Sequence, residues 1–487
     1  MEIVNAIYNG NKIDIINPSG IITSYSFKDL EYPYFYGVPD NNKRFSEEEL
    51  DAIISTKKMD IQYYTETGIK TVKGYKINVK NPSVIFKLKT KFSMVFEATI
   101  PYLRRLSLDN IISYSKNVKY YADIDVEERN GEIEIVGYKD NIDNEYKALS
   151  VSEFLKIIKD RHITEIWAWN GNSYDFTLFN DEYYKHIAKM DAMIYYSVFL
   201  QKPYRSLDYA GEEQHLGNKV HFTKEFNELT KEELINYNKQ DVLLMSNIID
   251  KVGLRKLSHL LANEFNLPYN EIYSQSINHA GISATRIFDS ILLISSNKEI
   301  HLLDNPNNSE KHEYEGAFVL EQQRGLHKDV CVIDINSLYP HVVMYYNYDN
   351  YLYDFMKSKE EYYYNIRINY KNKYEETKDE YYDTYQKVYK IIINAIYGIW
   401  GNTYYRYYDY KVAQHITRRG RETLLKMKNI IENYNKKNLL IIGGDTDSLF
   451  IENLTKNEGK ELAEYINKNL YPFEVKLDKY FKKLIML

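Results

Sequence analysis

Two apolar runs in the C-terminal third of the chain end in aspartates, and this pattern limits what the region can fold into. Asp334 directly follows Val330–Ile333, and Asp445 and Asp447 follow Leu439–Ile442 across two glycines. Because an apolar run resumes after Asp447, the second segment is predicted to form a hairpin with its carboxylates at the tip. Strand ends support side chains rigidly, so carboxylates placed there can hold divalent cations.

Length and composition exclude several classes of protein. The 487 residues are too many for a single core and predict about three or four compact units. Charged residues make up 27% of the chain and no apolar run approaches the length of a membrane span, so no membrane association is expected. The single cysteine, Cys331, excludes an intramolecular disulfide and a cysteine-ligated metal site. The net charge of −6 does not indicate a nucleic-acid-binding protein, although a local basic track is enough for one.

Three sequence signatures occur in a fixed order. Residues 334–340 read Asp-Ile-Asn-Ser-Leu-Tyr-Pro, residues 390–398 read Lys-Ile-Ile-Ile-Asn-Ala-Ile-Tyr-Gly, and residues 444–448 read Gly-Asp-Thr-Asp-Ser. In this order they resemble motifs A, B and C of the family B DNA polymerases. The resemblance implies template-directed synthesis on primer-template DNA from dNTPs, with two Mg²⁺ or Mn²⁺ ions in each active site.

The same resemblance implies roles for individual polymerase residues. Asp334 and Asp447 would bind the metals, with Asp445 as a further catalytic carboxylate beside them. Tyr339 would lie under the incoming sugar, where a 2′-hydroxyl would clash, so DNA is the expected product. The residues expected at the incoming nucleotide are Ser337, Leu338, Tyr339, Arg367, Lys371, Lys390, Asn394 and Tyr397, and those expected on DNA are Tyr314, Gly316, Arg418, Arg419 and Arg421.

Two further segments resemble the second and third motifs of the 3′→5′ exonuclease domain in this family. Residues 170–176 read Asn-Gly-Asn-Ser-Tyr-Asp-Phe, and residues 237–241 read Tyr-Asn-Lys-Gln-Asp. Asp175 and Asp241 are the implied metal ligands, and Tyr237 would orient the attacking water. Helical spacing places Tyr237 and Asp241 on one face.

The first exonuclease motif has two assignments. The family pattern is Asp-x-Glu, and residues 122–127 read Ala-Asp-Ile-Asp-Val-Glu. The pair Asp123/Asp125 fits the flanking apolar residues better but replaces Glu by Asp, whereas Asp125/Glu127 keeps both residue types. Alternation along a strand places either pair on one face. We favour Asp123 and Asp125 as the metal ligands, and the second pair stays open.

The chain is expected to have a multidomain fold of α/β and α+β type. An N-terminal β-rich domain is predicted for residues 1–118, where Pro33–Tyr36 and Phe96–Tyr102 resemble the archaeal or viral type of this family. The other predicted parts are a ribonuclease H-like exonuclease domain at 119–255, a helical connector at 256–305 with a linker at Asn305–Ser309, a palm with an antiparallel sheet at 306–352 and 399–487, and helical fingers at 353–398. No secretory signal is visible, and a cytoplasmic location in an archaeal cell or a virus-infected host is expected.

The resemblance also bears on the segment after the palm. Relatives continue into a helical thumb that wraps the duplex, whereas this sequence ends with Leu484–Leu487. We expect a split enzyme whose thumb is a second polypeptide, a truncated product, or another replication protein in the place of the thumb, with the apolar tail as an interface strand. Two alternative functions are a stand-alone 3′→5′ exonuclease with an inert polymerase half and a non-catalytic DNA-binding replication subunit.

Overall fold

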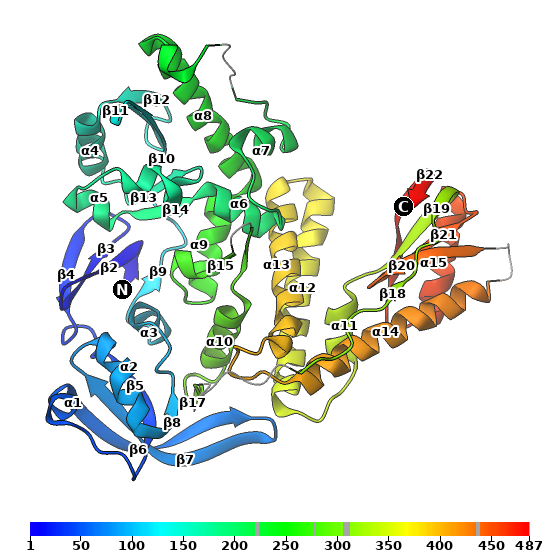
Figure 1. Ribbon diagram of the computed structural model, residues 1–487, viewed down its shortest axis with the longest axis horizontal. Coiled ribbons are helices and arrows are strands. Elements are labelled where there is room, and N and C mark those ends of the chain that lie inside the picture. Colours follow the sequence, from blue (N-terminus) through cyan, green and yellow to red (C-terminus); the bar gives the residue numbers. More distant parts are fainter. Residues whose placement is uncertain (220–223, 277–278, 305–311, 435–438, 487) are drawn as a thin grey trace. The chain divides into compact units, whose positions relative to one another are not determined.

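The computed structural model describes residues 1–219, 224–276, 279–304, 312–434 and 439–486, so the predicted linker Asn305–Ser309 lies outside the described residues. The fold is mixed α/β and multidomain, as the sequence predicts (Figure 1). It divides into two compact units. The first comprises Met1–Tyr64, Ile69–Asp304 and Arg367–Ile391, and the second comprises Thr65–Gly68, Asn305–Ile366 and Ile392–Leu487. The finer domain boundaries given above stay predictions.

Short strands dominate the N-terminal part of the first unit. One antiparallel sheet contains β2 (Asn5–Asn9), β3 (Lys12–Ile16) and β4 (Ile22–Ser26), and β1 (Glu2–Ile3) pairs with β9 (Ser113–Tyr114). A five-stranded sheet has the order β17-β6-β7-β5-β8. Its strands are β5 (Tyr34–Pro39), β6 (Ile53–Thr65), β7 (Gly68–Val79), β8 (Phe92–Phe96) and β17 (Ile300–His301), and the helices here are α1 (Glu47–Asp51), α2 (Ile85–Leu88) and α3 (Tyr102–Leu108). β6 and β7 form one long ribbon (Figure 1).

The next part of the first unit is a mixed sheet surrounded by helices. Its order is β12-β11-β10-β13-β14, in which β10–β12 are antiparallel and β13 and β14 run parallel to β10. The elements are β10 (Tyr121–Arg129), β11 (Glu132–Asp140), β12 (Tyr146–Leu149), β13 (Glu165–Ala168), β14 (Ala188–Asp191), α4 (Val151–Asp160), α5 (Glu182–His186), α6 (Ala192–Leu200), α7 (Leu207–Glu213) and α8 (Lys231–Val252). Ala122, Ile124 and Val126 of β10 are buried in the core, so the acidic residues between them face the other side.

Helix α8 lies close against that acidic side of the sheet. A capping box fixes its first turn, because Thr230 Oγ1 accepts the Glu233 amide while the Glu233 carboxylate accepts the Thr230 amide. At Gly137 of β11 an added Cβ would lie 1.8 Å from Asn238 Oδ1, so only glycine lets the helix approach this closely. The close approach brings side chains of α8 to the carboxylates of β10.

The helices predicted for residues 256–300 and 353–398 are present, with a hairpin in the first of these segments. α9 (Leu254–Glu264) and α10 (Ala284–Ser295) are helical, but β15 (Tyr273–Ser276) and β16 (His279–Ile282) form a hairpin between them. The helical pair predicted for residues 353–398 is present as α12 (Tyr351–Thr377) and α13 (Glu380–Gly398), and its assignment as fingers stays a prediction. The Tyr370 ring of α12 stacks on the Tyr389 ring of α13, with 5.9 Å between their centroids.

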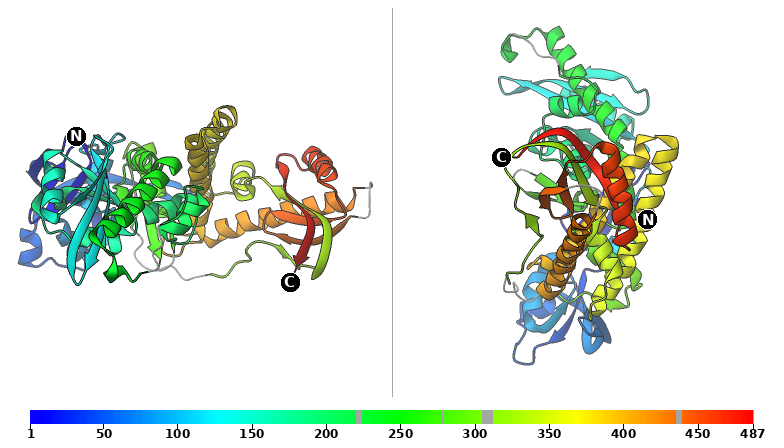
Figure 2. Two further views of the ribbon diagram at one scale, coloured as in Figure 1. Left: turned by 90° about the horizontal axis from the view of Figure 1, so that it is seen from above. Right: turned by 90° about the vertical axis from the view of Figure 1, so that its right-hand side faces the viewer.

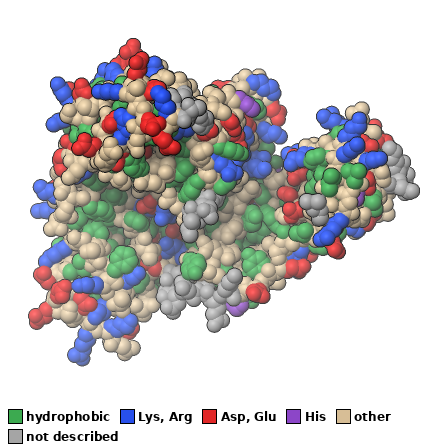
Figure 3. Space-filling view, turned by 45° about the horizontal axis from the view of Figure 1, so that its top comes forward, with side chains coloured by type: hydrophobic (Ala, Val, Ile, Leu, Met, Phe, Trp, Pro, Cys, Tyr) green, Lys and Arg blue, Asp and Glu red, His purple; other side chains and the backbone are tan. Residues whose placement is uncertain are grey.

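Charged and apolar side chains share the visible surface (Figure 3). On the face seen in Figure 3, basic and acidic side chains are interspersed. Within the described part of the chain, no helix combines the length and the apolar character that crossing a membrane requires.

The second unit is built on an antiparallel sheet, as predicted. Its order is β18-β20-β21-β19-β22. The elements are β18 (Val319–Leu320), β19 (Gly325–Ile335), β20 (Leu440–Asp445), β21 (Ser448–Glu452), β22 (Val475–Met486), α11 (Leu338–Tyr345), α14 (Tyr410–Glu432) and α15 (Lys456–Asn469). Helix α15 packs on β19 so closely that an added Cβ at Gly459 would lie 2.5 Å from Cys331 Sγ (Figure 2).

The C-terminal tail is a strand of this sheet. β22 pairs with β19 from Val475, opposite Ile335, to Met486, opposite Gly325. One edge of the predicted interface strand is therefore already paired within the chain, and β22 lies at the margin of the sheet. Binding of a partner to its other edge stays a prediction, and Leu487 lies outside the described residues.

Candidate active sites

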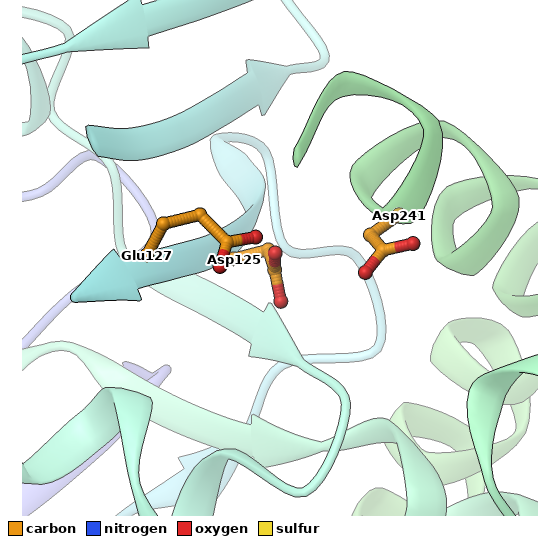
Figure 4. Close-up of side chains that lie close together, drawn as sticks. All are labelled: Asp125, Glu127 and Asp241. Atoms are coloured by element: carbon orange, nitrogen blue, oxygen red, sulfur yellow. The ribbon is translucent and has the colours of Figure 1, made fainter. Parts of the chain in front are cut away.

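Three carboxylates converge in the first unit. Asp125 and Glu127 lie on β10 and Asp241 lies on α8, and one oxygen of each lies within 4.8 Å of the others (Figure 4). These three residues are the acidic cluster. Glu127 and Asp241 are buried and Asp125 is half-buried. Oxygen ligands in this number and spacing suit Mg²⁺ and Mn²⁺.

Asn238 holds the two strand carboxylates in place. Its amide nitrogen donates to Asp125 Oδ2 at 2.9 Å and to Glu127 Oε1 at 3.4 Å. Its amide oxygen accepts from the Tyr146 hydroxyl at 2.9 Å, and the side chain is fully buried. Sequence reasoning missed this residue, although its position three residues before Asp241, on the same helix face, was a usable signal.

Burial and mutual repulsion make these carboxyl groups weak acids. Burial raises the pKa of Asp125 well above its ordinary value, and the charges of Glu127 and Asp175 raise it further. Burial also raises the pKa of Glu127 to about 7 and the pKa of Asp175 to about 6. A divalent cation bound among them would relieve the repulsion, because it favours the charged form of each ligand.

One buried oxygen of the acidic cluster lacks a hydrogen-bond partner. Asp241 Oδ2 pairs with Lys219 Nζ at 2.6 Å, whereas Asp241 Oδ1 is buried and has no donor among the described residues. A buried carboxylate oxygen in this state is costly unless a cation or a donor meets it. The three carboxylates of the acidic cluster, with this unpartnered oxygen, therefore fit a divalent cation.

Lys219 and Tyr237 line the site beside Asp241. Lys219 Nζ lies 5.0 Å from the centre of the Tyr237 ring and is hydrogen-bonded to its hydroxyl. Burial lowers the pKa of Lys219, but the charge of Asp241 outweighs that effect and raises it above the ordinary value, so this lysine stays charged. Sequence reasoning missed Lys219, which no motif pattern marks.

Asp175 lies beside the acidic cluster and is not one of its three members. It opens a short 3₁₀ segment, and its Oδ1 accepts the Val126 amide at 3.0 Å. The preceding loop turns at Asn170, whose φ is 61°, and Asp191 accepts the amides of Asn170 and Asn172 at 3.1 and 3.0 Å. These bonds fix the loop that carries Asp175 against β10.

The structure does not bring Asp123 into the acidic cluster. Its carboxylate pairs with Arg255 at 2.9 Å, and Arg255 also contacts Glu165, which pairs with His259 at 2.5 Å. All four side chains are buried. Residues two apart on a strand face the same side but lie about 7 Å apart, so Asp123 meets α9 whereas Asp125 meets α8. Asp123 is therefore part of a structural ion-pair network.

A cleft of about 430 Å³ opens beside the acidic cluster. Asp125, Asp241 and Lys219 line one part of it. Its other lining residues include Trp169, Met193, Tyr204 and Arg205. Aromatic and guanidinium faces of this kind can stack on nucleic-acid bases.

The raised pKa values predict how stability responds to pH. Glu and Asp titrate near about 4 in an unfolded chain, whereas burial raises the pKa of Glu127 to about 7 and that of Asp175 to about 6 in the folded protein. The folded state therefore binds protons more tightly. In metal-free buffer the melting temperature should fall as the pH rises from roughly 4 to 8, because the stability that these protons provide is lost through the folded-state pKa values.

Thermal unfolding at several pH values, with EDTA or with Mg²⁺, checks this prediction. Mg²⁺ should raise the melting temperature more at high pH, where the carboxyl groups are charged and can bind it. In Glu127→Gln, the melting temperature should depend less on pH, and the effect of Mg²⁺ should vary less with pH. A Mg²⁺ effect that is the same at every pH, or unchanged in Glu127→Gln, would contradict the link between these carboxyl groups and the cation.

The second unit carries the predicted strand-end aspartates. Asp334 lies opposite Ser448 of β21, and Asp445 and Asp447 lie where a tight turn joins β20 to β21. The Ile335 amide donates to the Asp447 carbonyl oxygen at 2.8 Å, so the main chains that carry Asp334 and Asp447 are adjacent. Within the described residues, only the acidic cluster brings three carboxylate oxygens within 4.8 Å of one another, and Asp334, Asp445 and Asp447 do not form such a group.

Tyr339, in the segment that resembles motif A, packs on Tyr397 of the segment that resembles motif B and beside Gly420 of α14. Its ring lies on the Tyr397 ring, with 4.6 Å between centroids, and an added Cβ at Gly420 would lie 2.9 Å from it. Burial raises the pKa of Tyr339, and the charge of Asp447 adds to this effect. The ring, its tyrosine neighbour and the Asp447 carboxylate are thus close in space.

The other residues predicted at the nucleotide lie on or beside helices. Ser337 has a φ of 49° and precedes α11, in which Leu338 is buried. Arg367, Lys371 and Lys390 belong to the first unit, whereas Asn394 and Tyr397 belong to the second. Lys371 pairs with Glu375 at 3.8 Å, and the side chain of Lys390 is exposed.

Arg421 of α14 fastens a loop. Its Nη1 donates to the carbonyl oxygens of Glu315 and Gly316, both at 2.6 Å. The Thr417 hydroxyl also donates to the Glu315 carbonyl, at 2.9 Å, and an added Cβ at Gly401 would lie 2.5 Å from the Tyr314 hydroxyl. The guanidinium of Arg421 is therefore engaged with the main chain of the Tyr314 loop.

Arg418 and Arg419 are the more accessible arginines of the same helix. Both contact Glu422, at 3.8 Å and 2.8 Å, and Arg419 also lies over the Tyr346 ring at 4.7 Å. The Arg418 side chain is 54% exposed, against 12% for Arg421. Of the predicted phosphate-binding arginines, these two are the ones whose charge reaches solvent.

Comparison with known proteins relates the chain to a family. The family model described as DNA polymerase family B matches residues 274–352 and 349–487. The DNA polymerase of Archaeoglobus fulgidus is 26% identical over 290 residues, which cover 53% of this chain and 35% of that protein. DNA polymerase 1 of Sulfolobus acidocaldarius is 28% identical over 204 residues, which cover 35% of this chain and 23% of that protein. The chain thus spans about a third or less of the length of these curated relatives.

A solved structure shares the fold. The family B DNA polymerase from the hyperthermophilic archaeon Pyrobaculum calidifontis matches with a TM-score of 0.72 and 17% identity, over 99% of this chain and 78% of that chain. At this identity the likeness concerns the fold. The family match covers residues 274–487, which include Asp334, Lys390 and Asp447. Taken with the archaeal relatives and the shared fold, this match shows that residues 274–487 are similar to the DNA polymerases of family B.

Proposed function

We propose that the chain is a template-directed DNA polymerase that extends a primer from dNTPs. The observation that carries this proposal is the adjacency of Asp334 and Asp447 on neighbouring strands, within the segment that matches the family. Tyr339, packed on Tyr397 and near Asp447, would support the sugar of the incoming nucleotide and exclude a ribose. For Lys390, Arg367 and the other residues predicted at the nucleotide, binding of the incoming dNTP stays a proposal.

Mg²⁺ or Mn²⁺ is the proposed cofactor, with two ions in each active site. Asp334 and Asp447 would hold the ions of the polymerase site, with Asp445 beside them. Bound there, the ions would activate the primer 3′-hydroxyl and stabilise the charge on the leaving pyrophosphate. The chain itself contributes rigidity, because β19 and β21 are paired directly behind both aspartates.

We also infer a 3′→5′ exonuclease site in the first unit. The acidic cluster, the unpartnered Asp241 Oδ1 and the adjoining cleft support it. In this proposal Asp125 and Glu127 form the first motif, in place of the pair Asp123/Asp125 that the sequence favoured, because Arg255 already neutralises Asp123. Asp175 and Asp241 keep their proposed role as ligands.

The chain's own residues would act at three points of the exonuclease reaction. Tyr237 would orient the attacking water, as its position beside Asp241 allows. Asn238 would keep Asp125 and Glu127 aimed at one point, and Lys219 would hold Asp241 charged before a cation binds. Aromatic residues of the cleft would receive the bases of the strand end.

A labelled primer-template incubated with the purified chain and Mg²⁺ tests both activities. The primer should lengthen when dNTPs are present and shorten when they are absent, and EDTA should stop both reactions. Shortening without any lengthening would favour the stand-alone exonuclease. If neither reaction occurs but the chain still binds DNA, the result would favour the non-catalytic replication subunit.

Primer-template DNA and dNTPs are the proposed partner and substrates. A second polypeptide that carries a thumb has no support among the contacts of the described residues and stays a prediction. If one exists, its addition should lengthen the products made in each binding event, because a thumb adds phosphate contacts to the duplex.

A further inference from the structure

The strand β22 holds most of the positive charge of the sheet in the second unit. Its sequence contains four lysines and one acidic residue, whereas β18, β20 and β21 contain no lysine or arginine. β22 pairs directly with β19, the strand that carries Asp334. Most cations of this sheet therefore lie on the strand next to Asp334, and both strands belong to the same compact unit.

Two of these lysines lie on the same face of the sheet as Asp334. Lys476 is the cross-strand partner of Asp334, and Lys479 is the partner of Val332. Directly opposed residues of an antiparallel pair point to one side, and Val332 and Asp334 are two residues apart on one strand. Residues three apart normally point to opposite sides, but a register shift that leaves Asp478 without a partner brings Lys476 and Lys479 to one side.

The face that carries these two lysines is not the face that α15 covers. An added Cβ at Gly459 of α15 would lie 2.5 Å from Cys331 Sγ. Cys331 is adjacent to Val332 on β19, and adjacent residues of a strand point to opposite sides. Lys476 and Lys479 therefore project from the face opposite α15, and both are exposed.

Neither lysine is strongly paired within the chain. Lys479 has no ion-pair partner among the described residues. Lys476 contacts Asp478 at 3.6 Å, and its side chain is 54% exposed, so this pair contributes little to stability. Both ammonium groups are therefore accessible to an anion from outside the chain.

The neighbouring aspartates create a need for positive charge at this place. The main chains that carry Asp334 and Asp447 are adjacent, and their carboxylates repel the phosphates of any DNA strand whose end approaches them. From strand geometry, the Cα atoms of Lys476 and Lys479 lie about 5 Å and about 8 Å from that of Asp334. Phosphates follow at about 3.4 Å along a DNA strand, so both lysines can reach phosphates of a strand that ends at Asp334.

We propose that Lys476 and Lys479 bind phosphates of the primer strand next to its 3′ end. This inference rests on the proposed polymerase function, in which Asp334 and Asp447 hold the ions at the primer 3′-hydroxyl. The two lysines would offset the charge repulsion between the aspartates and the primer backbone. They would also add affinity that does not depend on base sequence.

Equilibrium binding of a fluorescent primer-template duplex to the full chain, in EDTA and over a range of salt concentrations, tests the proposal. The variant Lys476→Gln/Lys479→Gln removes both charges. The matched control Lys460→Gln/Lys468→Gln removes two exposed lysine charges from α15, which covers the opposite face of the sheet. In the first variant the slope of log affinity against log salt should become shallower by about 2, with an affinity loss of about tenfold or more near 0.1 M salt, whereas the control should not change.

Neutral methylphosphonate linkages in the DNA locate the contact. Placed in the last linkages of the primer, they should weaken binding of the original chain more than binding of Lys476→Gln/Lys479→Gln, because that variant no longer contacts these phosphates. The same linkages in the template strand should weaken binding of both proteins equally. Lys476→Arg/Lys479→Arg keeps both charges and should bind the duplex like the original chain.

The results separate binding of the primer from binding of other phosphates. Equal slopes for the glutamine variant and the control overturn the proposal, and a coupling confined to the template linkages overturns the choice of the primer strand. A raised KM for dNTPs with unchanged duplex affinity overturns it in favour of the triphosphate. A loss that the arginine variant restores, with equal melting temperatures, supports the proposal. Because binding is measured without nucleotide addition, a failure of primer extension would count against the proposed function alone.

Discussion

Asp447→Asn should abolish primer extension by the purified chain, with a loss of about 10³-fold in rate. The substitution keeps the size of the side chain and removes the charge that would bind a cation. The hydrogen bond from the Ile335 amide ends on the main-chain oxygen of residue 447, so the turn should stay folded. Single-turnover addition of one nucleotide to a labelled primer measures the effect.

Asp478→Asn is the matched control for this substitution. It removes an exposed carboxylate from β22 of the same sheet, and it should extend primers at the original rate. Asp447→Asn should still shorten primers, because the acidic cluster belongs to the first unit. Normal extension by Asp447→Asn would exclude Asp447 as an essential ligand.

Asp125→Asn should abolish the Mg²⁺-dependent shortening of single-stranded DNA, also by about 10³-fold, whereas Asp123→Asn should largely preserve it. Both residues lie on the same face of β10, and the chemical change is identical. Asp125 lies in the acidic cluster, but Asp123 pairs with Arg255. Loss of that buried pair should instead lower the free energy of unfolding by about 3 kcal/mol, which denaturant titration measures.

Loss of shortening in Asp123→Asn as well as in Asp125→Asn would favour Asp123 and Asp125 as the metal ligands of the first exonuclease motif. Loss of shortening in Asp123→Asn counts only if its unfolding curve shows a folded protein at the assay temperature. Primer extension by both variants should continue, since neither change touches the second unit. A parallel loss of both activities would indicate unfolding and not the removal of a ligand.

The elements that carry Asp334, Asp445 and Asp447 were predictable because their features are local in the sequence. An apolar run followed by aspartates predicted the ends of β19 and β20, and the helical pair α12 and α13 followed from its composition. The helix that begins at Leu338 was not predicted, because a left-handed φ at Ser337 has no clear sequence signal. The β15–β16 hairpin was missed because short apolar segments fit a helix and a strand equally well.

The acidic cluster depends on contacts between residues that are remote in the sequence. Period-two alternation places Asp123, Asp125 and Glu127 on one face, so the strand alone cannot choose between the two assignments. Packing makes the choice, since Gly137 admits α8 beside Asp125 and Arg255 of α9 takes Asp123.

The contacts of two cationic residues were not predictable from the sequence, because they are tertiary. Lys219 meets Asp241 across a sequence separation that no motif spans. Arg421 was expected on DNA phosphates, but its guanidinium donates to the carbonyl oxygens of Glu315 and Gly316. The proposed DNA role of Arg421 therefore acts through the loop that it fastens.

The pairing of β19 with β21 and β22 has a consequence for biosynthesis. β19 carries Asp334, but its two neighbours in the sheet are the last strands of the sequence, after α12, α13 and α14. On the ribosome, the first unit can begin to fold while β19 still lacks both partners. The strand that bears Asp334 therefore stays an open edge until β21 and β22 emerge, and a nascent chain is most exposed to aggregation in that interval.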